Sequence, residues 1–293
     1  MSLEKITVFT GAATALITPF RGGEIDFDAL GGLIDRQIEA GISAILVAGT
    51  TGECATLREG ELFKLVSYAK EHIKNRVPLL SGCGSNSTER ACALAKAACE
   101  GGADALLAVP PYYNKTSERG IITHYTTLAD AVTRPLILYN VPSRTGFRMT
   151  LDLYRRLADH ESIVGVKEAS GDLNLLEALC AECGDKLDVY VGNDDQTVAA
   201  MKLGALGVIS VYSNIAPREM TEICRLCAAG DFRAASQRQR ASLPKMNALF
   251  KEVNPIPVKY VAAQLSLCDL EYRLPLCPPA PETVRALKAL FLP

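Results

Sequence analysis

Short, continuously apolar runs alternate along the chain with longer segments whose apolar residues recur at helical spacing. The runs lack the polar and apolar alternation of a half-exposed strand, which is typical of parallel strands covered on both faces. They predict eight strands, at residues 12–17, 44–47, 78–81, 105–109, 136–139, 163–167, 189–191 and 207–211.

The segments between these runs have the apolar stripe of amphipathic helices, and the clearest of them span residues 28–40, 59–73, 88–100 and 121–133. Asp26 and Thr88 are candidate N-caps, because a short polar side chain can accept a hydrogen bond from the first-turn N–H groups. Gly41 and Gly101 are candidate C-terminal stops, where a left-handed backbone favours glycine.

Eight strand–helix units of about 30 residues predict a TIM barrel, an α/β fold of eight parallel strands, at residues 1–229. A doubly wound open sheet is the alternative, but it rarely uses eight evenly spaced units, and no GxGxxG motif opens a helix here. Residues 230–293 contain several helical patterns and the rigid segment Asn254-Pro255-Ile256-Pro257. We expect them to form a C-terminal helical extension packed on the barrel.

Composition narrows the class of protein. Of the 293 residues, 48% are apolar and 22% charged, which is ordinary for a globular protein with a substantial core. The formal net charge is −2 without a long Lys/Arg run, so nothing indicates a nucleic-acid partner. No stretch of about 18 apolar residues indicates a membrane span, and residues 1–9 lack a signal peptide's apolar core. We expect a cytoplasmic protein.

The 10 cysteines are interpreted as reduced thiols, because disulfide scaffolds are small secreted chains. Cys180/Cys183 and Cys224/Cys227 have the CxxC spacing of zinc ligands. Both pairs lie in helix-like segments, where positions i and i+3 simply share a face, whereas structural zinc pairs usually lie on tight turns. A zinc site is therefore the less favoured interpretation of these pairs.

Lys167 ends the apolar run 163–167, and a charged side chain at the end of a buried strand requires a physical explanation. Removing an ammonium group from water costs several kcal/mol, so a buried lysine is either paired or has a lowered pKa. A neutral lysine amine is a nucleophile toward carbonyl carbon, the starting condition for Schiff-base chemistry. Lys167 is therefore a candidate catalytic residue.

Other polar residues also gather at the predicted strand ends, where TIM barrels carry their chemistry. These ends include Gly49-Thr50-Thr51-Gly52-Glu53, Tyr112-Tyr113-Asn114, residues 139–146, Gly192-Asn193-Asp194-Asp195 and Ile209-Ser210. Hydroxyl and backbone N–H groups around Thr50 and Thr51 can hold a carboxylate near the next helix. The alternative is that both threonines only shape the turn.

Tyr139 and Arg144 have ordinary interpretations when each is taken alone. A strand-end tyrosine usually packs its ring in the core and satisfies its hydroxyl with a carbonyl, and an arginine usually forms a surface salt bridge. At one barrel mouth, however, a phenol can shuttle protons and a guanidinium can grip a carboxylate with two hydrogen bonds. The case for both rests on their convergence with Lys167.

The three histidines, His72, His124 and His160, fall within helical patterns or at the end of one. No strand end therefore offers a cluster of histidines and carboxylates for a catalytic metal. This argues against metal-assisted carbonyl chemistry and for amine catalysis, and we expect the chain to use neither a metal nor another cofactor.

Segments spread over nearly the whole chain together resemble the dihydrodipicolinate synthase family of pyruvate-dependent aldolases. The matching segments are residues 14–20, 49–57, 111–114, 139–146, 165–171 and 254–259. The wider superfamily shares the GxTGE and lysine elements. The combination of Thr50-Thr51 with Ser143-Arg144-Thr145-Gly146 is similar to the synthases in particular.

The resemblance implies a Schiff-base-forming lyase that condenses pyruvate with L-aspartate 4-semialdehyde to give 4-hydroxy-tetrahydrodipicolinate, the first committed step of lysine and diaminopimelate biosynthesis. Lys167 would form an imine with pyruvate, and Thr51 with neighbouring amides would hold the pyruvate carboxylate. Arg144 would bind the carboxylate of the semialdehyde. The carbonyl groups of Gly192 and Ile209 would line the pocket.

The resemblance also implies a proton relay and an oligomer. Tyr139 would move protons during imine and enamine formation, hydrogen-bonded through Thr50 to Tyr113 of a neighbouring subunit. A site completed in this way requires at least a dimer, and the family expectation is a homotetramer built as a dimer of dimers.

Regulation is where the chain departs from the family pattern. Lysine-inhibited members carry histidines and a glutamate at positions that correspond here to Glu59, Leu62 and Arg90. An added arginine and no imidazole should weaken binding of a cationic ligand by several kcal/mol in a buried site. We therefore predict little or no feedback inhibition by lysine.

Two other functions stay open on the sequence alone. One is an aldolase of the same superfamily that acts on a sugar acid, keeping Lys167 and Tyr139 but using another acceptor than the one Arg144 suggests. The other is a non-catalytic binding protein or scaffold on an inherited barrel. The intact set of lysine, tyrosine, threonine and arginine argues against the scaffold.

Overall fold

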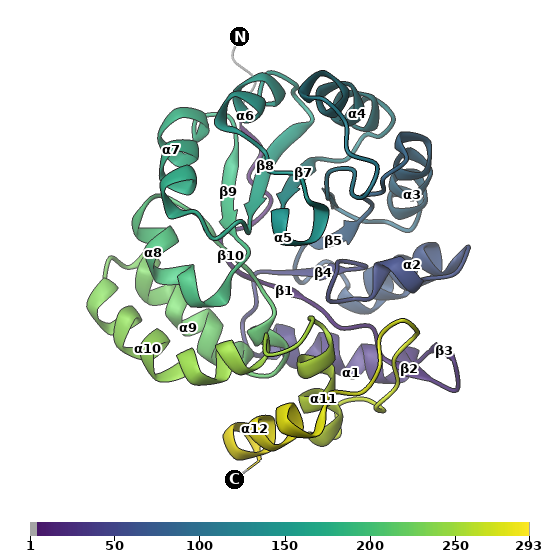
Figure 1. Ribbon diagram of the computed structural model, residues 1–293, viewed down its shortest axis with the longest axis vertical. Helices are drawn as coiled ribbons and strands as arrows, with labels where there is room; N and C mark the ends of the chain where they lie inside the picture. The colour runs from purple at the N-terminus through teal and green to yellow at the C-terminus, as the bar shows by residue number, and fades with distance from the viewer. Residues whose placement is uncertain (1–4, 293) are drawn as a thin grey trace.

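The computed structural model describes residues 5–292 and contains a closed barrel of eight parallel strands (Figure 1). Consecutive strands pair with one another and the first pairs with the last, so the sheet has no free edge. The strands are β1 (Gly11–Ala15), β4 (Ala44–Val47), β5 (Leu79–Gly82), β6 (Ala105–Ala108), β7 (Leu136–Asn140), β8 (Ile163–Glu168), β9 (Asp188–Val191) and β10 (Gly207–Ser210). The predicted TIM barrel is confirmed, and every predicted strand overlaps an observed one.

Helices surround the strands on all sides in Figure 1 and cover their outer face. They are α1 (Phe27–Glu39), α2 (Glu61–Ile73), α3 (Thr88–Glu100), α4 (Glu118–Asp130), α6 (Leu151–Leu157), α7 (Leu173–Cys183), α8 (Thr197–Lys202) and α9 (Pro217–Ala228). Single turns follow several strands directly, namely η1 (Cys54–Thr56), α5 (Pro142–Thr145), η2 (Asp194–Gln196) and η3 (Tyr212–Asn214).

The helix caps agree with the sequence in part. Asp26 caps α1 as predicted, accepting a hydrogen bond from Ala29 N, and Gly41 follows that helix with a left-handed φ of +81°. The prediction of Thr88 as a cap is wrong. Ser87 accepts the bond from Arg90 N, while the Thr88 hydroxyl pairs with the ring of His124. Two adjacent hydroxyls both suit a cap, and the tertiary contact decides between them.

Apolar side chains fill both sides of the barrel wall. Leu46, Leu80, Ile137 and Ile209 belong to the interior cluster, and a second, larger cluster lies between the strands and the helices. The strands are buried on both faces. This is why their sequences are continuously apolar rather than alternating.

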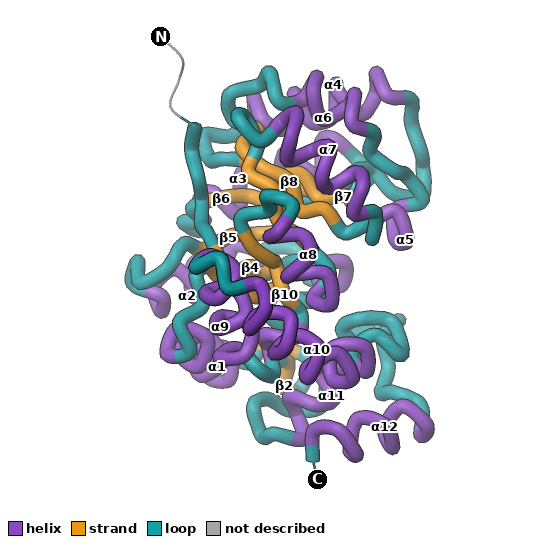
Figure 2. Tube along the Cα trace, turned by 90° about the vertical axis from the view of Figure 1, so that its left-hand side faces the viewer, coloured by secondary structure: helices purple, strands orange, loops and turns teal. Residues whose placement is uncertain are grey.

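Three further helices follow the barrel, α10 (Phe232–Ala248), α11 (Ile256–Gln264) and α12 (Pro281–Phe291). α10 packs on α8 and α9, and α12 packs on α10 and α11. Figures 1 and 2 show α11 near the small hairpin of β2 (Phe20–Arg21) and β3 (Glu24–Ile25), which the sequence did not predict. The division of the chain at residue 229 remains a proposal.

The cysteines are free thiols, and the two CxxC pairs lie inside α7 and α9, as the helical patterns indicated. Within residues 5–292, no three His, Cys, Asp or Glu side chains are grouped so as to hold a metal ion. Over the same residues, no helix combines the length and apolar character needed to cross a bilayer.

Candidate active site

Lys167 lies on β8, in register with Tyr139 of β7 and Tyr190 of β9. Its side chain is 5% exposed, and Nζ lies 4.5 Å from the centroid of the Tyr139 ring. None of the ion pairs found within residues 5–292 involves it. The sequence prediction of a buried lysine at this strand end is confirmed.

The environment of Lys167 favours the neutral amine. Burial lowers the pKa of Lys167 to about 8, with Arg144 adding to the shift and the buried carboxyl of Asp194 opposing it. A pKa near 8 leaves about one amine in ten uncharged at pH 7. The group is therefore a nucleophile under ordinary conditions.

Gly192 provides the space that Lys167 occupies. A Cβ at this position would lie 2.9 Å from Lys167 Cε and 2.6 Å from Ala169 Cβ, closer than real side chains approach. The Gly192 N–H donates to Glu168 O over 2.7 Å, which holds this backbone against β8. Only glycine therefore lets the lysine extend across the end of β9.

Tyr139 is 8% exposed and faces the same space as Lys167. Burial raises the pKa of Tyr139, while Arg144 and a hydrogen bond with the Thr50 side chain oppose the rise. The phenol consequently keeps its proton at neutral pH and can both donate and accept at one oxygen.

The loop that follows β4 holds Thr50 and Thr51 in a tight turn. Gly52 N donates to Gly49 O and Glu53 N donates to Thr50 O, each over 3.1 Å. Thr51 is 3% exposed, and its hydroxyl accepts from Asn254 Nδ2 at 3.0 Å. Thr51 is therefore bonded to a residue 203 positions further along the chain.

Arg144 lies in α5, directly after β7, with an exposed side chain. Its Nη2 donates to Asn254 O over 3.0 Å, and its charge acts on both Lys167 and Tyr139. It forms no salt bridge in the described part of the chain. A guanidinium without an acidic partner at this mouth is suited to an anionic ligand.

Two residues at this site, Asn254 and Asp194, have no role in the sequence analysis. Asn254 bonds Thr51 through its side chain and Arg144 through its carbonyl, so it links two predicted site residues. Asp194 Oδ2 accepts from Val211 N and Tyr212 N, over 3.1 and 2.9 Å. Thr51 lies 203 positions from Asn254, and the partners of Asp194 are backbone N–H groups, so no local side-chain pattern indicates either contact.

Two predicted residues lie apart from this cluster of polar side chains. Ile209 is fully buried in the apolar barrel interior, in register with Ala13. Tyr113 has a left-handed φ of +68° and is 91% exposed. It therefore makes little contact with its own subunit.

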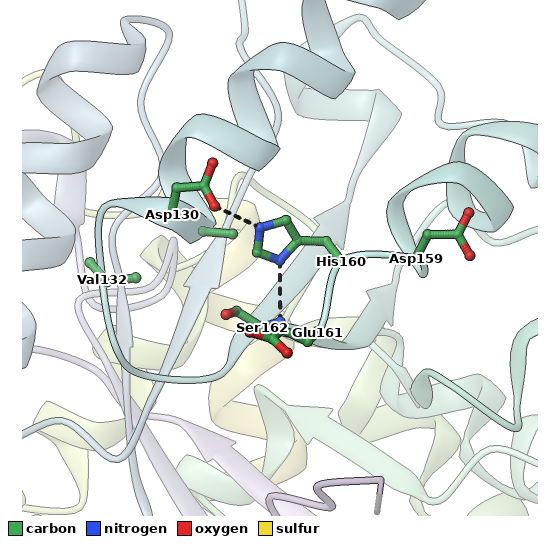
Figure 3. A pocket seen from close by; sticks show the side chains of 7 residues that line it. Asp130, Val132, Asp159, His160, Glu161 and Ser162 are labelled. Carbon is green, nitrogen blue, oxygen red and sulfur yellow. Dashed lines mark hydrogen bonds and ion pairs between the residues drawn. The ribbon is translucent and has the colours of Figure 1, made fainter. Parts of the chain in front are cut away.

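The opposite end of the barrel has a shallow hollow but none of the predicted site residues (Figure 3). Ser162 N donates to His160 Nδ1 at 3.2 Å, so His160 Nε2 carries the hydrogen that faces Asp130 Oδ1 at 3.0 Å. These residues precede β8 and follow α4, at the amino ends of the strands. The reactive groups of the barrel are thus concentrated at the carboxyl ends.

Comparison with known proteins agrees with the family resemblance noted in the sequence. The model of the dihydrodipicolinate synthetase family matches residues 8–291. The chain is 45% identical to the 4-hydroxy-tetrahydrodipicolinate synthase of Geobacter metallireducens, over 97% of this chain and 98% of that protein. It is 42% identical to the enzyme of that name from Clostridium novyi, over 97% and 96%.

Solved structures agree. The dihydrodipicolinate synthase of Aquifex aeolicus superposes with a TM-score of 0.94 at 41% identity, over 96% of both chains. The synthase of Acinetobacter baumannii, solved with pyruvate, also gives 0.94 at 41% identity, over 97% of both chains. The chain belongs to the dihydrodipicolinate synthetase family.

Proposed function

We propose that this chain carries out the family reaction with Lys167 as the Schiff-base lysine. The enzyme is a lyase of lysine and diaminopimelate biosynthesis that condenses pyruvate with L-aspartate 4-semialdehyde to give 4-hydroxy-tetrahydrodipicolinate. One observation carries the assignment to Lys167. It is a buried amine at the mouth of the barrel that forms no salt bridge with any carboxylate of residues 5–292.

The neutral amine attacks the ketone carbon of pyruvate and forms a carbinolamine, which loses water to become a protonated imine. Loss of a methyl proton then gives an enamine, whose carbon attacks the aldehyde of the second substrate. The amino group of that substrate displaces the lysine as the product cyclises, which returns Lys167 to its free state. Each step moves a proton, and we assign this transfer to Tyr139 with Thr50; the raised pKa of the Tyr139 phenol supports the assignment.

The two substrate carboxylates have separate binding groups. Thr51 and the amides of its turn hold the pyruvate carboxylate, and the carbonyls of Gly192 and Ile209 line the pocket around Lys167. Arg144 binds the carboxylate of the semialdehyde. Its exposed position at the rim suits a substrate that enters after pyruvate is bound.

The oligomer is a further part of the proposal. The 91% exposed ring of Tyr113 reaches the Thr50 hydroxyl of a neighbouring subunit and completes the proton relay there, in a tetramer built as a dimer of dimers. One related structure, at 38% identity, is described as a monomeric variant, so assembly varies within the family. The cytoplasmic location expected from the sequence remains a prediction.

Borohydride trapping tests the central assignment. Treating the protein with pyruvate and borohydride should reduce the imine and leave a stable adduct on Lys167, located by mass spectrometry of peptides. Adding the semialdehyde before the reductant should decrease the adduct. An adduct on another lysine, or none, would overturn the assignment and favour a scaffold function.

The acceptor is tested separately at Arg144. The Arg144→Gln variant should lose semialdehyde turnover by roughly a hundredfold or more, because a charged hydrogen bond to the substrate is removed. Formation of the pyruvate adduct should be unchanged. If semialdehyde turnover persists, the acceptor is a different aldehyde, such as a sugar-derived one.

A further inference from the structure

A second lysine, Lys259 on α11, is fully buried and paired with the carboxylate of Glu53, with 2.5 Å between Nζ and Oε1. Both side chains have no exposed surface. The ammonium also lies 4.2 Å from the centroid of the Phe20 ring. The pair joins the helical extension to the loop that carries Thr50 and Thr51.

The other oxygen of Glu53 is also held by the extension. Glu53 Oε2 accepts from Arg273 N over 3.3 Å, and the Arg273 guanidinium donates to Thr56 O at 3.1 Å and forms an ion pair with Glu61. The same guanidinium lies 4.2 Å from the Phe20 ring. The loop between β4 and α2 is therefore bound along its length by residues more than two hundred positions away.

The backbone of Glu53 explains why the loop needs this support. Its φ is +56°, a left-handed conformation that residues other than glycine adopt at a cost. In that conformation its N–H donates to Thr50 O and closes the turn around Thr51. A strained conformation persists only where the surroundings fix it, and Lys259 is the strongest partner that Glu53 has.

We propose that Lys259 is a positioning residue for the condensation: its ammonium group fixes Glu53, and through Glu53 the turn whose hydroxyl and amide groups bind the pyruvate carboxylate. This inference rests on the proposed function of that turn. The ion pair is neutral as a whole and touches no substrate. Its contribution is geometric, and it makes the C-terminal extension part of the active site.

The test removes both charges at once, because a single substitution would leave a buried charge unpaired and lower the stability of the protein. In the Glu53→Gln, Lys259→Met double variant, KM for pyruvate should rise about tenfold while kcat falls less than about threefold. KM for the semialdehyde should stay within about twofold. Hydrogen exchange of the amides of residues 50–54 should become about tenfold faster.

Two comparisons keep the outcome decisive. Leu153→Ala in α6, on the far side of the barrel from α11 in Figure 1, lowers the melting temperature without touching the loop. If it raises KM for pyruvate equally, general destabilisation explains the effect and the proposal is wrong. If the double variant does not fold, Glu53→Asp, which keeps both charges but shortens the side chain that meets Lys259, must show the same selective rise in KM.

The result also separates this inference from the assignment of Lys167. At saturating pyruvate, the double variant should still form the complete borohydride adduct on Lys167. An unchanged KM with a normal adduct refutes the positioning role alone. A missing adduct in the wild-type protein refutes the proposed function itself.

Discussion

Two lysines are buried in this molecule, and their surroundings differ in one respect. Lys167 is 5% exposed at the barrel mouth and forms no salt bridge with any described residue, whereas Lys259 is fully buried with Glu53 at 2.5 Å. Burial lowers the pKa of both amines and a carboxylate opposes the shift at each, Asp194 at Lys167 and Glu53 at Lys259, but of the two only Glu53 is hydrogen-bonded to its lysine. A buried lysine that forms no ion pair, such as Lys167, is thus a nucleophile, whereas a buried lysine in an ion pair, such as Lys259, is a structural contact.

The largest expected effect is the loss of chemistry at Lys167. Lys167→Met should reduce turnover by at least about a thousandfold, because the covalent route is removed. Its stability near pH 7 should stay equal or increase, since a desolvated amine is replaced by an apolar chain of similar length. An assay of turnover and chemical denaturation measure the two quantities. If Lys167→Met retained turnover, Lys167 would not be the reactive member of the two buried lysines.

Lys259 should behave in the opposite way. Lys259→Met leaves the carboxylate of Glu53 buried and unpaired, so the free energy of unfolding should fall by about 3–5 kcal/mol. The Glu53→Gln, Lys259→Met double variant should recover most of that loss. Denaturant titration of the three proteins measures this. If Lys167→Met were equally destabilising, the distinction between the two lysines would fail.

A pH titration of stability distinguishes the unpaired lysine directly. The pKa of Lys167 is about 8 in the folded protein, against 10.5 for a lysine in water, which represents the unfolded chain. Between these values the unfolded chain binds a proton that the folded protein does not, so stability should rise with pH over this window. The total rise is about 3 kcal/mol, and below pH 8 the contribution is constant.

The control for this titration is Lys167→Met, which lacks the ionisable group. Subtracting its stability at each pH removes the contributions of the other titrating residues. Imine formation with pyruvate should also accelerate as pH rises and level off above about pH 8, because only the neutral amine reacts. A flat difference curve would show that Lys167 has an ordinary pKa.

A smaller effect is expected at Gly192, where Lys167 needs an empty Cβ position. Gly192→Ala should slow imine formation about 10- to 100-fold and lower stability by about 1–3 kcal/mol, because the lysine must leave its place. Gly32→Ala is the matched control. It lies in α1 with no atom within 4 Å of a new Cβ, so it should be neutral or slightly stabilising.

The smallest effect concerns free lysine as a ligand. Arg90 is exposed in the first turn of α3 and Leu62 is buried in α2. A cationic ligand bound there would be repelled by the positive charge of Arg90 and would find no imidazole to contact. We expect turnover to change by less than about twofold at millimolar lysine. Saturable inhibition at sub-millimolar lysine would show that Glu59 and its neighbours form an effector site after all.

How far the sequence predicts the molecule depends on the range of the interaction. The eight strands and Lys167 are predictable, because continuous apolar runs and a charge at the end of one are local signals. Lys259 lies in a helical segment where a lysine normally faces water, so nothing local indicates its burial. Its partner Glu53, like the partner of Asn254, is about two hundred residues away, beyond any local pattern.

The bonds between the C-terminal extension and the loop after β4 also bear on the order in which parts of the active site become available during synthesis. Asn254, Lys259 and Arg273 bond to Thr51 and Glu53, which precede them by 203 to 220 positions. During synthesis, the ribosome releases the threonine turn long before it releases these partners. If the proposed role of this turn holds, a growing chain gains the ability to bind pyruvate only with the final part of translation.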